Sequence, residues 1–147
     1  MTQSAPNEFN ADAEAPRDWK LASRRGFSMR CPHCGEGEMF HAYLKVSEAC
    51  PKCGEELHHQ RADDAPPYMT IFVVGHIVAA MLMVADGYYP ALPMWIHMVL
   101  WPLVAILMSL WFLPRIKGAL IGLQWALRMH GFHPDSREDA PMPVPAP

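Results

Sequence analysis

The sequence predicts a small β zinc ribbon, followed by an all-α two-helix transmembrane hairpin and a C-terminal amphipathic helix. Three observations predict this fold class: two Cys-Pro-x-Cys-Gly repeats, two apolar runs between Tyr68 and Leu113 with Asp86 as the only charge, and a basic amphipathic stretch after them. The 147 residues include 12 Lys+Arg and 15 Asp+Glu. Their uneven spread excludes a single soluble domain, and a net charge of -3 offers no basic stripe for nucleic acid.

Both ends of the chain are predicted to be disordered. Residues 1–25 place acidic side chains and prolines in an Ala, Asn and Ser background, and residues 132–147 are rich in proline. Neither composition buries enough apolar area to offset the loss of chain entropy. Residues 1–25 also lack the basic start, apolar run and cleavage pattern of a secretory signal peptide, so we expect none.

Residues 26–62 carry the predicted zinc ribbon. Cys31, Cys34, Cys50 and Cys53 form two C-x2-C pairs with 15 residues between them, the spacing of a two-knuckle zinc site. In each pair, Pro after the first Cys pre-sets a tight turn, and Gly after the second supplies a positive φ. Short strands are expected within residues 39–44 and 57–60. Because so small a module has little core, we expect one Zn(II) per chain to supply much of its folding free energy, about 10 to 16 kcal/mol.

The same cysteines fit two other chemistries. A rubredoxin-like iron site uses the same knuckles, although the intervening segment is short for that fold. Two disulfides would need an oxidising compartment, whereas a reducing cytoplasm is expected here. Histidines could also replace a thiolate, but four well-spaced cysteines favour surface positions for them: His33, His41, His58 and His59.

Residues 63–113 are predicted to form the transmembrane hairpin. As helices, residues 68–85 would be about 27 Å long and residues 92–113 about 33 Å, which matches a hydrocarbon core of about 30 Å. Residues 86–91 form the expected turn, with Gly87 and Pro90 as helix breakers.

The distribution of Lys and Arg orients the hairpin. Eight precede it (Arg17, Lys20, Arg24, Arg25, Arg30, Lys45, Lys52 and Arg61), four follow it (Arg115, Lys117, Arg128 and Arg137), and the turn has none. The positive-inside rule therefore predicts that both termini are cytoplasmic.

Residues 114–131 are predicted to form an amphipathic helix along the cytoplasmic interface. Lys117, Gln124 and Arg128 share one face, and Pro114 suits a helix start. The cations would lie near anionic lipid headgroups. A bent continuation of the second span is the competing interpretation.

Two histidines lie inside the predicted spans, where ionisable side chains indicate function. A haem or copper site shared by His76 and His97 would draw on nearby methionines. At 1.5 Å per residue, however, His76 lies about 12 Å from the cytoplasmic edge and His97 about 20 Å or more. Helix–helix hydrogen bonding or contact with a partner therefore fits better.

Asp63 and Asp64 precede the first span, and one of them is expected to cap a helix whose first turn contains proline. The sequence contains no nucleophile–base pair, Gly-rich phosphate loop or His-Glu zinc protease motif. An enzyme is therefore not expected.

The order of these motifs resembles domain-of-unknown-function family 983. The resemblance runs from Cys31 to Met129 and includes the two knuckles, the Asp63-Asp64-Ala-Pro-Pro segment, Gly75-His76-Ile, Met94-Trp-Ile-His97 and the segment from Pro114 to Gln124. Members are small bacterial membrane proteins without an established activity, often encoded near cytochrome oxidase subunits and assembly factors. The resemblance implies a bacterial inner-membrane location and these candidate partner-contact residues: Asp63, Asp64, His76, His97, Lys117 and Gln124.

We therefore expect a non-enzymatic, membrane-anchored assembly or interaction factor that contacts the lipid bilayer and a membrane protein complex. Terminal cytochrome oxidase is implied by the resemblance alone. A membrane-bound redox or metal or haem delivery protein is one alternative, and a structural subunit of a membrane complex is another.

Overall fold

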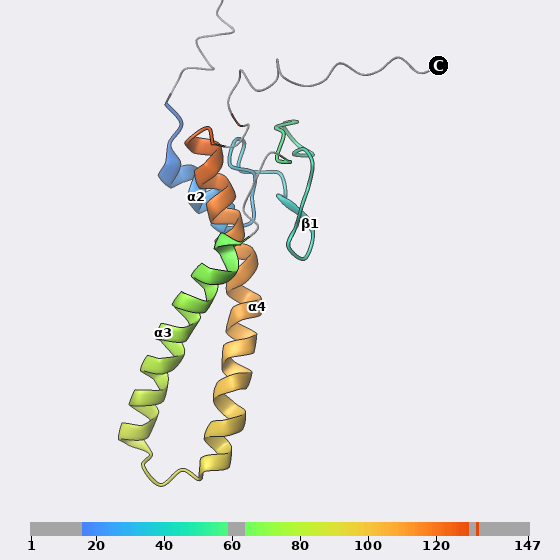
Figure 1. Ribbon diagram of the computed structural model, residues 1–147. Coiled ribbons are helices and arrows are strands. Elements are labelled where there is room, and N and C mark those ends of the chain that lie inside the picture. The colour runs from blue at the N-terminus through green and yellow to red at the C-terminus, as the bar shows by residue number, and fades with distance from the viewer. Residues whose placement is uncertain (1–15, 59–63, 130–131, 133–147) are drawn as a thin grey trace, which may run out of the picture.

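The computed structural model describes residues 16–58, 64–129 and 132. Their elements are α2 (Trp19–Phe27), β1 (Phe40–Ala42), β2 (Lys45–Val46), α3 (Ala65–Tyr88) and α4 (Met94–Ala126). Figure 1 shows α3 and α4 as a long hairpin, with α2 and the strands beside the C-terminal part of α4, away from the hairpin turn. A small two-stranded sheet with a cysteine cluster, followed by two long apolar helices, confirms the ribbon and the helical hairpin of the predicted fold class.

Both long helices are apolar enough to cross a membrane. Each has a mean hydropathy of 2.1 over its most apolar window, of which only 11% is buried in α3 and 6% in α4. The core helix of a soluble protein would instead hide such a surface inside the molecule. The chain is thus a membrane protein with two candidate spans.

Helix α3 extends beyond the predicted span at both ends. Pro66 occupies the first turn, where its missing N–H costs no helical hydrogen bond. Asp64 takes the N-cap position but makes no side-chain cap hydrogen bond, so the expected cap is only positional. At the other end the helix continues through Gly87 to Tyr88, so the turn is shorter than predicted.

Helix α4 is continuous over 33 residues, and the prediction of a separate interfacial helix over residues 114–131 is wrong. The segment is helical as expected, but it extends the second span to Ala126, which is the competing interpretation. At 1.5 Å per residue α4 is about 50 Å long, well beyond a hydrocarbon core of about 30 Å. Helix α4 is therefore too long to lie entirely within the core along the membrane normal.

A contact from the turn between the strands compensates for the proline inside α4 at residue 114. Proline has no N–H, so the carbonyl of Leu110 loses its helical donor. The hydroxyl of Tyr43, in the turn between the strands, donates to that carbonyl at 3.0 Å. This long-range hydrogen bond satisfies the acceptor that Pro114 leaves open.

The prediction of a disordered tail through residue 25 is wrong for residues 19–25, which belong to α2. The Asp18 carboxylate caps this helix by accepting from the backbone N–H groups of Lys20 at 2.9 Å and Leu21 at 3.2 Å. Residues 1–15 lie outside the described residues, as do residues 133–147. Phe132 is buried beside Trp125, so the predicted C-terminal tail does not begin at residue 132.

Helix α2 packs closely on the end of α4. A Cβ atom at Gly26 would overlap the carbonyl of Gly118, and one at Gly122 would overlap the carbonyl of Ala22. Residues without bulky side chains therefore let the two backbones meet at two points, one turn apart on each helix. The composition of residues 19–25 alone would not offset the entropy cost of ordering this segment, but its packing against α4 does.

The sheet is a short antiparallel hairpin. Phe40 pairs with Val46 and Ala42 with Lys45, and Leu44 in the turn has a φ of 61°. The strand expected over residues 57–60 is absent at Leu57 and His58, and residues 59 and 60 lie outside the described part of the chain. Leu57 is instead fully buried in the core beside the cysteines.

Candidate metal centre

Two turns of matching geometry hold the four cysteines. The N–H of Gly35 donates to the carbonyl of Cys31, and the N–H of Gly54 donates to that of Cys50, both at 2.9 Å. The two glycines have φ values of 77° and 74°. Both turns thus have the positive φ that the sequence predicts at the glycine after each pair.

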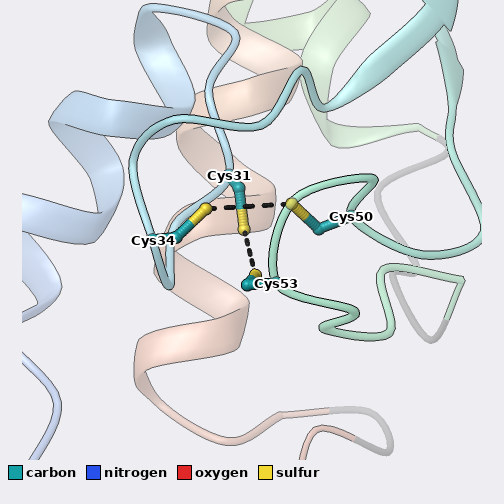
Figure 2. A group of neighbouring side chains, drawn as sticks. All are labelled: Cys31, Cys34, Cys50 and Cys53. Atoms are coloured by element: carbon teal, nitrogen blue, oxygen red, sulfur yellow. Dashed lines mark hydrogen bonds between the residues drawn. The ribbon is translucent and has the colours of Figure 1, made fainter.

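The four sulfur atoms converge on one point between the two turns. Figure 2 shows the thiols of Cys31 and Cys34 facing those of Cys50 and Cys53. All four sulfurs lie within 4.8 Å of one another; Cys31 Sγ is 3.7 Å from Cys53 Sγ, and Cys34 Sγ is 3.8 Å from Cys50 Sγ. Four sulfurs at about 2.3 Å from a tetrahedral ion would be about 3.8 Å apart. The thiols therefore fit a single metal ion.

No disulfide links any two of the four cysteines. All four cysteines are free, and the Sγ separations above far exceed a disulfide bond of about 2.05 Å. Among the described residues, no histidine joins the cluster. His33, His41 and His58 are exposed, as predicted for surface histidines, and His59 lies outside the described residues.

The cysteine site shares its core with α4. Cys31 and Cys50 are buried in one cluster with Met39, Leu57 and Ile121, the last of which is fully buried and comes from α4. Cys53, by contrast, is exposed. The site thus has one side against the membrane helix and one edge at the surface, and the ribbon is not an independent module on a tether.

Gly37 makes room for the sulfur of Cys50. A Cβ atom at residue 37 would overlap Cys50 Sγ, and the carbonyl of Gly37 accepts from the N–H of Cys31 at 2.8 Å. The residue therefore links both halves of the site. Sequence inspection missed Gly37 because it lies outside the knuckle pattern.

The thiols differ in their readiness to ionise. The backbone N–H of Gly37, together with that of Glu36, lowers the pKa of Cys34 to about 6. Burial raises the pKa of Cys31, and burial likewise raises that of Cys53. Cys34 therefore offers a thiolate near neutral pH, and a bound cation would favour ionisation of Cys31 and Cys53.

Arg25 of α2 supports the first turn. Its guanidinium donates to the carbonyls of Pro32 at 3.1 Å and His33 at 2.6 Å. A divalent ion with four thiolates has a formal charge of about -2, so a cation beside this turn offsets part of that charge.

Trp125 near the end of α4 contacts both turns. Its indole N–H donates to the Glu55 carboxylate at 2.8 Å, next to the second turn. The His33 ring of the first turn lies 5.8 Å from the Trp125 ring, and the Arg17 guanidinium lies 4.2 Å from it. No spacing in the sequence singled out Trp125, because its partners are distant along the chain.

The candidate partner-contact residues lie in different places. Lys117 Nζ donates to the carbonyl of Leu44 at 3.0 Å, so it fastens the strand turn to α4. The Trp101 indole donates to His97 Nδ1 at 3.0 Å, and Asp86 on α3 is 3.8 Å from the same nitrogen. His97 therefore serves contacts within the hairpin.

Among the described residues, the remaining candidates are also separate from the cysteine cluster. His76 is exposed on α3 and contacts Phe72 of its own helix. Gln124 is half-buried on α4, Asp64 is exposed before α3, and Asp63 lies outside the described residues. Neither histidine belongs to a group of three or more potential ligands in the described chain.

The family model described as Protein of unknown function (DUF983) matches residues 40–125, more than half of the chain, so the chain belongs to this family. The match confirms the resemblance. It covers the second cysteine turn, the hairpin and nearly all of α4, and begins after the first cysteine turn. No curated protein and no solved structure matches the chain.

Proposed function

We propose that this DUF983 protein is a non-enzymatic assembly or interaction factor for a membrane protein complex. In this proposal a zinc-stabilised head in the cytoplasm is built onto a two-span anchor in the bacterial inner membrane. Terminal cytochrome oxidase is the first complex to examine, through the family association alone. The observation that carries the proposal is the shared core, in which Ile121 of a membrane helix packs among the metal-binding cysteines.

The donor set supports a structural metal. Four cysteines would fill all four positions of a tetrahedral ion and leave none for a substrate, which is the pattern of structural zinc. The metal would hold two short turns together in a head that has little other core. Zinc suits this task because it has no redox chemistry of its own.

The shared core also supports a role in binding. Because Ile121 and Trp125 fix the head to α4, a partner that contacts the head and the hairpin together meets two surfaces of defined relative position. Such preorganisation reduces the entropy cost of association. The proposed orientation places both termini and the head on the cytoplasmic side, as the Lys and Arg distribution favours.

The test is co-purification of the full-length chain from gently solubilised native membranes. We expect the chain to bring down immature forms of one membrane complex. Cys34→Ser should disrupt the head and abolish this association while the variant still inserts into the membrane. Lys52→Ala, an exposed change in the same head, is the matched control. Association that survives Cys34→Ser would contradict the proposal, and presence only in the mature complex would favour a structural subunit.

One observation favours a second function. Cys53 is exposed, so one edge of the metal site is at the surface, as electron transfer with a partner would require. A redox iron site would use the same four thiolates. Reversible bleaching of visible absorption on reduction would identify it, whereas a zinc site has no such absorption.

A further inference from the structure

Helix α3 exposes a histidine on the side opposite to its buried residues. The opposite face of α3 carries the buried residues Thr70 and Val74, whereas His76 is exposed. His76 Nδ1 lies 2.7 Å from the carbonyl oxygen of Phe72. A carbonyl only accepts, so Nδ1 carries the proton, and in the neutral ring Nε2 is an acceptor.

The position of His76 makes that acceptor costly. His76 lies eleven positions after Ala65 at the start of α3, which is about 16 Å along the helix and well inside a core of about 30 Å. Polar side chains at this depth rarely face lipid, and they pair with other protein groups. None of the described residues donates to Nε2.

The surface beside His76 is hollowed. A shallow cavity of about 250 Å³ is lined by Ile71, Phe72, Gly75, His76 and Ala79. Apart from the backbone of α3 and the neighbours of Gly75 in the chain, no atom lies within 4 Å of the place where a Cβ of Gly75 would be. Small residues let the backbone of a second transmembrane helix approach, and polar side chains hydrogen-bond across such contacts.

We propose that a transmembrane helix of a different protein docks in this hollow and donates a hydrogen bond to His76 Nε2. A second copy of the chain fits less well on a symmetric contact, because the two neutral rings would each present an acceptor to the other. A hydroxyl, amide or indole N–H from the partner supplies the missing donor. This inference rests on the proposed function and names the surface through which the hairpin binds.

The test uses a photocrosslinker in the full-length chain in native membranes. p-Benzoylphenylalanine replaces Phe72, whose ring is 67% exposed and packs 4.3 Å from the His76 ring. The control carries the same group in place of Leu107, which is 58% exposed on α4. We expect a discrete adduct with another membrane protein from position 72 only.

The acceptor at residue 76 is then substituted in the chain that carries the photocrosslinker at position 72. His76→Leu should lower the adduct yield about 3- to 20-fold, the range for hydrogen bonds between transmembrane helices. His76→Gln keeps an acceptor and should restore most of the yield. An adduct with a second copy of the chain, an unchanged yield in His76→Leu, or no protein adduct would each overturn the inference. If co-purification of a complex persists in any of those cases, the docking surface fails while the proposed function stands.

Discussion

The hydrogen bond from Tyr43 to the carbonyl of Leu110 provides a sharp test of how the head is attached to α4. Tyr43→Phe removes the donor and leaves that carbonyl with neither a helical nor a side-chain partner. A neutral hydrogen bond contributes about 1 kcal/mol net, and an orphaned acceptor costs about 1 to 3 kcal/mol. Because Tyr43 is 54% exposed, water recovers part of this loss, so we expect a cost of about 1 to 2 kcal/mol.

The matched background is Pro114→Ala, which restores a backbone N–H that can donate to the same carbonyl. In that background Tyr43→Phe should cost less than about 0.5 kcal/mol, because the acceptor keeps its helical partner. Tyr88→Phe, at a side chain that is 78% exposed, controls for loss of a hydroxyl.

The assay is limited trypsin digestion of the detergent-solubilised chain, followed at Lys45 and Lys52 in the head. When opening is fast relative to cleavage, the cleavage rate follows the open population, and each 1.4 kcal/mol changes it about tenfold. Tyr43→Phe should therefore raise cleavage about 5- to 30-fold in the native background and about 2-fold or less with Pro114→Ala. Equal increases in both backgrounds would refute this account of the proline.

Two glycine substitutions test the close contacts. Gly37→Ala places a methyl group on Cys50 Sγ and should weaken zinc retention against a chelator about 100-fold. Gly54→Ala has open space around the new methyl group and should weaken zinc retention only about tenfold, through the positive φ at this position. Equal losses of zinc retention in the two variants would contradict the steric argument. Gly118→Ala should separate α2 from α4 and lower the midpoint of thermal unfolding by several degrees. The control Gly87→Ala, with no neighbour within 4 Å, should change this midpoint by about a degree or less. Similar midpoints for the two variants would disprove the close packing.

Local patterns in the sequence were sufficient to predict the cysteine turns and both long helices. The turn at each cysteine pair needs only neighbouring residues, namely Pro and Gly at fixed offsets. The helices needed only two apolar runs that are long enough to cross a membrane. Their ends shifted by a few residues, because a helix such as α3 can continue past Gly87 when nothing forces it to stop.

The parts that the sequence did not reveal depend on contacts between distant residues. Pro114 normally indicates a helix start or break, and the hydrogen bond that compensates for its missing N–H comes from Tyr43, far away in the chain. Helix α2 forms where the composition predicts disorder, because Gly118 and Gly122 let its backbone pack closely against α4. The sequence predicts Lys117 as a candidate partner contact, which stays a prediction; its hydrogen bond to Leu44 within the molecule could not be foreseen.

Metal analysis of the purified full-length chain, with an absorption spectrum of the same sample, tests the central claim of a metal-stabilised head most directly. The account predicts about one zinc ion per chain and no visible absorption, as expected for four thiolates around one tetrahedral ion. Removal of that zinc by a chelator should expose the head to protease. A chain without metal whose head still resists protease would contradict the account, and iron in place of zinc would favour the redox function.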